Sequence, residues 1–262
     1  MPALDPRAGA SVAADVTAGV AAAWRAQNQA LADLLRAHDP ATAVPTCPGW
    51  TLANLLTHVG RGDRWAATIV ARRLDTVLDP REVPGGKPPD GGAVDWLLAG
   101  VDELTAAVAA TGAATPVWTF TGPRPSAWWL RRRLHECVVH RADAALAVGA
   151  PFDAPADVAA DGVSEWLTLL AARPGADDPP LADGTTMHLH ATDEGLGAAG
   201  EWMVRPAGDR VTWEPGHAKG TVAVRGPAAD LLLVLLRRLP PDRVEVLGDA
   251  AVFERWLART GF

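Results

Sequence analysis

The stretch RRRLHECVVHRADAALAVG, Arg131–Gly149, decides how the fold of this chain is interpreted. It predicts a helix on which Glu136 and His140 lie four residues apart, one above the other on the same face. A carboxylate and an imidazole placed in this way can bind one metal ion. They can equally belong to a solvated polar stripe in which Arg132 and Glu136 form a surface ion pair. The spacing alone leaves both interpretations open.

The composition describes a globular protein with an excess of negative charge. Of the 262 residues 48% are hydrophobic and 21% charged, and the net charge of −7 argues against nucleic acid or an anionic membrane as a partner. The N-terminal residues show no leader pattern, and the longest apolar run, residues 231–236, is too short to cross a bilayer. Cys47 and Cys137 form no CxxC pair. We therefore expect a cytoplasmic protein with no membrane partner.

The first 150 residues predict four amphipathic helices. Hydrophobic residues recur there at helical spacing, and no segment convincingly predicts a strand. Thr51 and Ser126 are placed to cap the second and the fourth helix. We expect these helices to form a four-helix bundle. The helical segments are residues 15–37, 52–74, 93–110 and the helix that contains the opening stretch.

Beyond Pro151 the pattern becomes that of an α+β domain. Short alternating runs separated by Gly, Asp and Pro predict strands, and three longer segments predict helices. We therefore expect a two-domain protein of the α+β class, with domains at residues 1–150 and 151–262. The predicted strands are residues 186–192, 201–205, 210–214, 221–225 and 243–247, and the helices are residues 156–172, 228–239 and 250–259.

A histidine on the second predicted helix can complete a metal site. His58 together with Glu136 and His140 would supply two imidazoles and one carboxylate. A catalytic zinc usually has three protein ligands and one open position, and facing helices of a bundle build such sites. A histidine on an apolar face is, however, more often a hydrogen-bonded core residue. Gly60 and Gly62, which follow at once, indicate close approach of another backbone or space for a ligand.

Two blocks of sequence together resemble a known family. PTCPGWT (residues 45–51), followed by Leu55 and His58, and HECVVHRADAALAVG (residues 135–149) are similar to the mycothiol-dependent maleylpyruvate isomerase family of the DinB-like metalloenzyme superfamily. Residues 189–205 and 221–256 resemble the C-terminal domain of that family, which is similar to sterol-carrier-protein folds. The resemblance implies a DinB-like four-helix bundle followed by a small α+β domain of that kind.

The resemblance also implies ligands, cofactors and a reaction. The zinc ligands of the family fall on His58, Glu136 and His140. A catalytic arginine that usually follows a glycine falls on Arg238, although Arg237 stands in the place of that glycine. Zinc or another divalent metal and mycothiol, a low-molecular-weight thiol, are the implied cofactors. The implied enzyme is an isomerase or S-transferase that acts on a small electrophilic substrate bearing a carboxylate.

The mechanism that this resemblance suggests depends on a thiolate. Binding to the metal would keep the thiol sulfur deprotonated, ready to add to an activated double bond or to displace a leaving group. Arg238 would hold the substrate carboxylate. Two other functions stay open, a non-catalytic module that binds a small ligand and a thiol-independent zinc hydrolase. The substrate, the metal and the choice between monomer and homodimer are not fixed by the sequence.

Several other residues near the opening stretch have more than one interpretation. His135 and Cys137 point away from Glu136 around the helix, so we expect a poor ligand and a core residue, respectively. Asp143 lies on the side of His140 and can orient its imidazole, or it can make an ordinary surface or helix–helix hydrogen bond. Cys47 can have a redox role, but packing is the favoured interpretation.

Tryptophans and two further histidines complete the set of candidates. Trp50 and Trp65 are expected in the core, whereas Trp128 and Trp129 can also wall a pocket. His188 and His190 alternate on one predicted strand and share a face. Because no Asp, Glu or Cys stands at matched spacing, a second metal site there is the less favoured interpretation.

Overall fold

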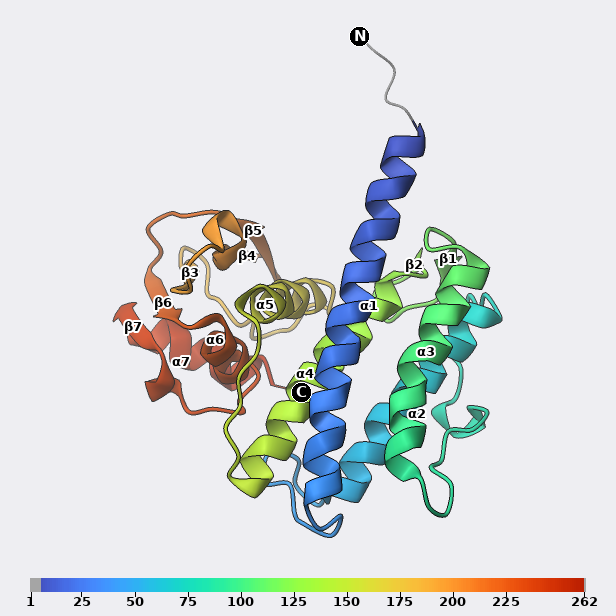
Figure 1. Cartoon of the computed structure of the whole chain (residues 1–262). Coiled ribbons are helices and arrows are strands. Elements are labelled where there is room, and N and C mark those ends of the chain that lie inside the picture. The colour runs from blue at the N-terminus through green and yellow to red at the C-terminus, as the bar shows by residue number, and fades with distance from the viewer. Residues whose placement is uncertain (1–5, 262) are drawn as a thin grey trace. The chain divides into compact units, whose positions relative to one another are not determined.

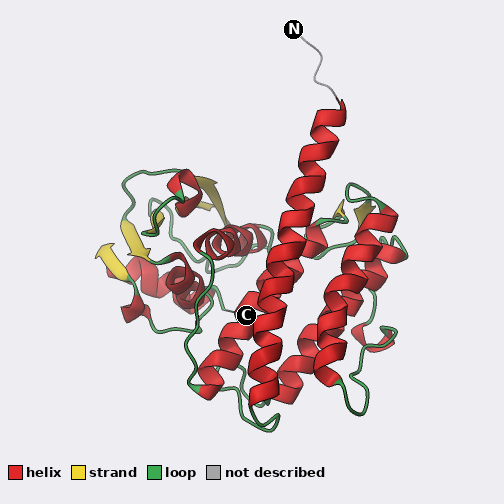
Figure 2. Ribbon diagram, viewed as in Figure 1, coloured by secondary structure: helices red, strands yellow, loops and turns green. Residues whose placement is uncertain are grey.

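The computed structural model describes residues 6–261, with side chains described from Thr17 onward (Figure 1). The chain divides into two compact units between Phe152 and Asp153. The first unit is mainly helical, and the second contains a five-stranded sheet (Figure 2). Among the described helices none has the length and apolarity needed to cross a membrane. The expected absence of a leader falls partly on residues 1–5, which lie outside the described residues.

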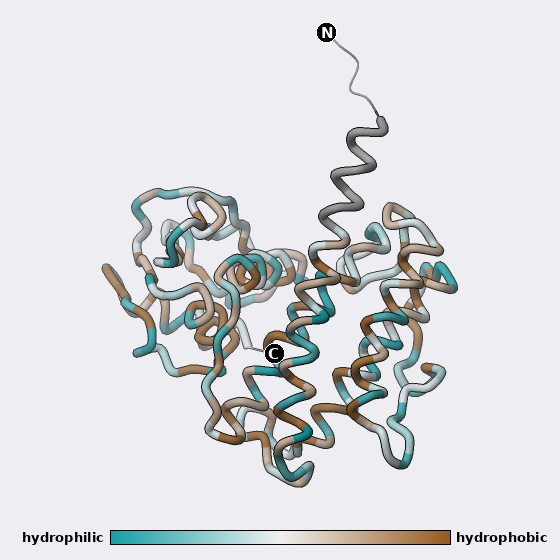
Figure 3. The backbone as a smooth tube through the Cα atoms, in the orientation of Figure 1, coloured by the Kyte–Doolittle hydropathy of each residue, from teal (hydrophilic) through white to brown (hydrophobic). Residues whose placement is uncertain are grey.

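Four helices form the first unit, and each packs against two of the others. Helix α1 contacts α3 and α4, and α2 contacts the same two helices. Hydrophobic and hydrophilic stretches alternate along these helices (Figure 3), as expected where one side of each helix is buried. Helix α1 begins earlier than predicted, and the other three agree closely with the predicted segments. The helices are α1 (Pro6–Ala37), α2 (Leu52–Ala71), α3 (Ala93–Thr111) and α4 (Trp128–Val148).

One of the two predicted helix caps is confirmed. The Thr51 hydroxyl accepts a hydrogen bond from the Asn54 amide, and the Asn54 side chain accepts one from the Thr51 amide, which forms a capping box. The Ser126 cap is wrong, because Ala127 occupies the cap position of α4. The Ser126 hydroxyl instead donates to the Gly112 carbonyl at 2.9 Å, and thus ties the connector before α4 to the end of α3.

The connector between α3 and α4 contains a small antiparallel ladder that was not predicted from the sequence. Strand β1 (Pro116–Val117) pairs antiparallel with β2 (Arg124–Pro125). Strands of two residues are too short for an alternating pattern to appear in the sequence. The loop between α2 and α3 contains a single 3₁₀ turn, η1 (Pro80–Glu82).

The second unit packs three helices against a mixed sheet with the strand order β5-β4-β3-β6-β7. Strands β3 and β6 are parallel, and the other neighbours are antiparallel. All five predicted strands are present, although the helix predicted over residues 228–239 ends at Leu235. The elements are α5 (Ala156–Ala171), β3 (Met187–Ala191), η2 (Gly197–Gly200), β4 (Glu201–Ala207), β5 (Arg210–Pro215), β6 (Val222–Gly226), α6 (Ala228–Leu235), η3 (Pro241–Arg243), β7 (Glu245–Gly248) and α7 (Ala250–Arg259).

The two faces of this sheet differ in chemistry. Leu189 of β3 and Trp202 of β4 are paired in register and fully buried. The Trp202 indole donates to the Ser164 hydroxyl of α5 at 2.8 Å, so this face carries the core. Because side chains alternate along a strand, His188 and His190 point to the other face.

Candidate metal centre

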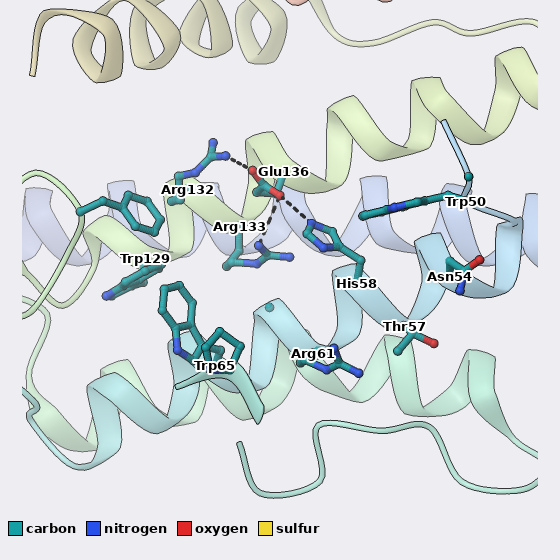
Figure 4. A pocket seen from close by; sticks show the side chains of 14 residues that line it. Trp50, Asn54, Thr57, His58, Arg61, Trp65, Trp129, Arg132, Arg133 and Glu136 are labelled. Carbon is teal, nitrogen blue, oxygen red and sulfur yellow. Dashed lines mark hydrogen bonds and ion pairs between the residues drawn. The ribbon is translucent and has the colours of Figure 1, made fainter. Parts of the chain in front are cut away.

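The histidine of α2 and the two predicted ligands of α4 come together. His58 Nε2 and His140 Nε2 each lie 3.5 Å from Glu136 Oε2. The two imidazole rings meet edge to face with their centroids 4.8 Å apart. Figure 4 shows His58 and Glu136 pointing toward each other from facing helices. Segments almost eighty residues apart in the chain therefore present three potential ligand atoms that lie within 4.8 Å of one another.

A hydrogen bond fixes the orientation of His140. Its Nδ1 lies 2.9 Å from Asp143 Oδ2, one turn further along α4, so of the two roles considered for Asp143 the structure shows the contact with the imidazole. Asp143 is completely buried and also accepts from the Thr46 hydroxyl at 2.6 Å and from the Cys47 thiol at 3.4 Å. With Nδ1 engaged in this way, His140 presents Nε2 to Glu136.

His58 has the protonation state that a metal ligand requires. Burial, and next the charge of His140 and of Arg133, lower the pKa of His58 to about 3. The side chain remains 44% exposed, on the side where it faces a pocket. At neutral pH the ring is therefore neutral, and its lone pair is available for an ion. Two imidazole nitrogens and one carboxylate oxygen form a donor set that suits zinc and other borderline divalent ions.

Two arginines hold the carboxylate of Glu136. Arg132, one turn earlier on α4, forms an ion pair with Oε1, and Arg133 Nη1 lies 3.6 Å from Oε2. The side chains of Arg132 and Glu136 are only 11% and 20% exposed. The ion pair considered from the sequence is thus real, but it belongs to the wall of a pocket and not to a solvated surface stripe.

A pocket of about 700 Å³ opens beside the three predicted ligands (Figure 4). His58 and Glu136 line it, and Arg61, Arg132 and Arg133 add three positive charges. Four aromatic side chains form part of the remaining wall. The aromatic lining residues are Trp50, Trp65, Phe120 and Trp129.

The core positions expected for Trp50 and Trp65 are wrong. Both are half-buried and line the pocket. The Trp50 ring lies 4.8 Å from the His58 ring and stacks on His140 at 6.1 Å, which places an aromatic wall against the two imidazoles. Trp65 packs edge to face on Trp129, with centroids 5.3 Å apart. The pocket-wall role considered for Trp129 is therefore confirmed.

The arginines were not predicted as parts of the pocket, although their spacing from the predicted ligands indicates it. Arg61 follows His58 by three residues, and Arg132 precedes Glu136 by four, so each shares a helix face with a predicted ligand. Gly62 makes room for Arg133, because a Cβ at position 62 would lie 2.7 Å from its guanidinium. The glycines of α2 therefore accommodate side chains of neighbouring helices and not another backbone.

A rival set of ligands shares His140 but is less suitable. Cys47, His140 and Asp143 also lie within 4.8 Å of one another. Both oxygens of Asp143 already accept hydrogen bonds, from Thr46, Cys47 and the His140 ring. The set with His58 and Glu136 instead faces the pocket.

Two residues of α4 are excluded from the site. His135 is buried, and it belongs to none of the possible ligand clusters among the described residues. Cys137 is completely buried, and burial raises the pKa of its thiol far above the ordinary range. It therefore remains a protonated core residue, as the sequence predicts.

Arg238 follows α6 in the second unit, and the residue before it takes the place expected of a glycine. Arg237 has φ +60°, in the left-handed region. Its amide donates to the Val234 carbonyl, and the Arg238 amide donates to the Leu233 carbonyl, which is a Schellman motif. Arg237 thus adopts a turn conformation that a glycine adopts more easily. The guanidinium of Arg238 donates to the Leu236 carbonyl at 2.9 Å.

Comparison with known families decides the relationship. The family model described as the mycothiol maleylpyruvate isomerase N-terminal domain matches residues 6–145, and the MDMPI C-terminal domain matches residues 157–255. The chain belongs to the mycothiol-dependent maleylpyruvate isomerase family. Membership in this enzyme family confirms the resemblance seen in the sequence. The two matched domains together cover most of both units.

Two solved structures have a fold similar to that of this chain. A crystal structure of the mycothiol-dependent maleylpyruvate isomerase matches with a TM-score of 0.61 at 18% identity, over 88% of this chain and 92% of that one. A mutant of that protein with one histidine replaced by alanine matches with a TM-score of 0.59 at 17% identity over the same shares. Comparison with curated proteins finds no significant match.

Proposed function

We propose that this member of the family is a metal-dependent enzyme that uses a low-molecular-weight thiol, mycothiol, to isomerise a small electrophilic substrate or to transfer sulfur to it. The observation that carries the proposal is the convergence of His58 and His140 on one oxygen of Glu136, each at 3.5 Å. Those three residues are the proposed ligands of a divalent ion, zinc first among the candidates.

We infer that the chain consists of two domains of different kinds. Residues 1–150 are the proposed metal-binding domain, a four-helix bundle of the DinB-like kind. Residues 151–262 are the proposed second domain, which resembles sterol-carrier-protein folds. Packing of α1 and α2 against α3 and α4 supports the first assignment, and a mixed sheet with three packed helices supports the second.

The residues of the site would prepare it for thiol chemistry. A bound divalent ion would supply positive charge that favours the thiolate form of a thiol. Asp143 would keep the Nε2 of His140 directed to the site, and the low pKa of His58 keeps its ring neutral. Arg132 and Arg133 hold Glu136 in one orientation.

The charges of the pocket favour an anionic substrate. Of the three arginines that line it, Arg132 is paired with Glu136 and Arg133 with the buried Asp63, whereas Arg61 has no acidic partner among the described residues. Guanidinium groups bind carboxylates in a bidentate geometry that an ammonium cannot match. The proposed substrate is therefore a small carboxylate with an activated double bond or a leaving group. Arg238 remains the proposed catalytic arginine, with a substrate carboxylate as its partner.

A metal and thiol assay on the purified protein tests this proposal. We expect wild-type protein, reconstituted with zinc, to isomerise maleylpyruvate only when mycothiol is present. His58→Ala and Glu136→Gln should each lower the rate by at least about 100-fold, because loss of one ligand of three removes the ion. His38→Ala is the matched control, since His38 lies near the end of α1, where its Nδ1 lies 2.8 Å from the Leu34 carbonyl, and it belongs to none of the possible ligand clusters among the described residues.

Each alternative function gives a different result. Turnover without any thiol would show a hydrolase and contradict the thiol-dependent proposal. Zinc binding and thiol binding without turnover of any small electrophilic acid would show a binding module. Equal activity of wild type and His58→Ala would show that the proposed metal centre takes no part in the reaction.

A further inference from the structure

A second cluster of metal-binding side chains lies in the second unit, on the sheet face opposite the core. His188, His190 and Glu201 meet there with His217, and their potential ligand atoms lie within 4.8 Å of one another. We propose that these four residues form a second site for a divalent transition ion of the zinc type. The site is separate from the one built by α2 and α4.

Strand pairing explains why the carboxylate was not foreseen. His190 of β3 is paired in register with Glu201 of β4, and His188 lies two residues away on the same face. Along β3 itself no acidic residue stands at matched spacing. Glu201 instead reaches the two histidines from the neighbouring strand, where cross-strand side chains are about 5 Å apart.

A loop supplies the fourth side chain. The amide of Gly216, at the end of β5, donates to the Glu201 carbonyl at 3.1 Å, which fixes the start of the loop beside that residue. His217 follows at once, and its Nδ1 lies 3.1 Å from both carboxylate oxygens of Glu201. The side chain of His217 is 73% exposed, whereas those of the two strand histidines are 6% and 26% exposed.

The spacing of the four side chains suits a single ion. His188 Nε2 lies 2.5 Å from Glu201 Oε2, and His190 Nδ1 lies 3.0 Å from Oε1. A tetrahedral zinc with bonds of about 2.0–2.1 Å holds its ligand atoms roughly 3.3 Å apart. Binding of one ion would therefore lengthen the contact between His188 and Glu201 and bring the more distant ligand atoms, which lie up to 4.8 Å apart, closer together.

The donor set also indicates the class of ion and its role. Three imidazoles and one carboxylate suit zinc, nickel, cobalt or copper, and disfavour magnesium and calcium, which prefer oxygen ligands. Four side chains fill a tetrahedral shell, so the ion would be structural. It would hold the loop that starts at Gly216 against strands β3 and β4.

Metal stoichiometry of the full chain tests the proposal. Tag-free protein is stripped with a chelator, reconstituted with zinc chloride, desalted and analysed for zinc. Wild type should retain one equivalent more than the double variant His190→Ala/His217→Ala. His38→Ala, which removes a histidine outside the cluster, should retain as much as wild type. Circular dichroism checks that the double variant is folded.

The His58→Ala background separates the second site from the first. In that background zinc should still bind and raise the Tm, and addition of His190→Ala/His217→Ala should abolish both effects. Retention of all zinc by the double variant would overturn the second site. A complete loss of zinc binding in His58→Ala alone would also overturn the second site. If His58→Ala removes no zinc while the double variant removes all of it, the second site stands and the proposed catalytic centre fails.

Discussion

Asp143 Oδ2 lies 2.9 Å from Nδ1 of His140, and the carboxylate is completely buried between α4 and the loop that precedes α2. Thr46 and Cys47 of that loop donate to the same carboxylate. The PTCPGW segment therefore does more than connect helices. It supplies the hydrogen bonds that fix Asp143, and through Asp143 it orients one proposed ligand.

We expect Asp143→Asn to weaken zinc binding at the first site by about 10–100-fold, as is typical when the hydrogen-bond partner of a metal-binding histidine is lost. Competition with a chromogenic chelator, in a His190→Ala/His217→Ala background, measures the affinity of this site alone. Thr46→Val removes one of the donors that fix Asp143 but leaves the bond to His140, so it should weaken zinc binding less than Asp143→Asn does. An unchanged affinity in Asp143→Asn would show that Asp143 does not position the ligand.

Local patterns predicted most of the secondary structure but not the contacts between distant residues. Helical spacing and the Thr51 cap were visible because each depends on residues a few positions apart. The Ser126 hydroxyl was misassigned, because its partner, the Gly112 carbonyl, is brought near by the fold. Glu201 and the pocket positions of Trp50 and Trp65 were missed for the same reason. The approach of His58 to Glu136 and His140 joins two distant segments, and the family resemblance was what favoured it over the other interpretations of these residues.

Gly60 of α2 leaves space for the ring of Trp96 on α3. A Cβ at position 60 would lie 2.2 Å from that ring. Trp96 cannot move freely, since its indole donates to the Gly85 carbonyl at 2.9 Å and the Arg64 guanidinium stacks on it at 4.3 Å. We expect Gly60→Ala to lower the free energy of unfolding by about 1–2 kcal/mol, because overpacking outweighs the helix propensity gained.

Urea unfolding measures this effect, and Gly19→Ala in α1 provides the control. A Cβ at position 19 meets no atom within 4 Å. Only the helix propensity should change there, which raises the free energy of unfolding by up to about 1 kcal/mol. If both substitutions stabilise the protein, the contact with Trp96 does not restrict position 60.

Arg237 adopts a conformation that costs a residue with a side chain roughly 1–2 kcal/mol. Arg237→Gly should therefore raise the free energy of unfolding by about 1 kcal/mol, in spite of the lost contact between the guanidinium and Gly261. Arg237→Ala loses the same contact and retains the unfavourable φ, so it should not stabilise the protein. Equal gains in both variants would mean that the guanidinium, and not the backbone, is the source of the strain.

The buried thiol of Cys137 makes stability depend on alkaline pH. Burial, and next the nearby charge of Asp63, raise the pKa of Cys137 well above its ordinary value of 9.0. Above pH 9 the unfolded chain therefore loses this proton while the folded chain keeps it. The unfolded state then binds fewer protons, and the free energy of unfolding falls as the pH rises.

We expect this contribution to be complete below pH 9 and to decrease above it by about 1.4 kcal/mol per pH unit. Urea unfolding between pH 8 and pH 10.5 should show a smaller slope for Cys137→Ala than for wild type, whereas Cys47→Ala should keep the part of the slope that Cys137 causes. The absence of tyrosine from the chain removes one other group that ionises in this range. Identical slopes for wild type and Cys137→Ala would mean that water reaches the thiol in the folded protein, which its complete burial between α4 and Asn28 of α1 argues against.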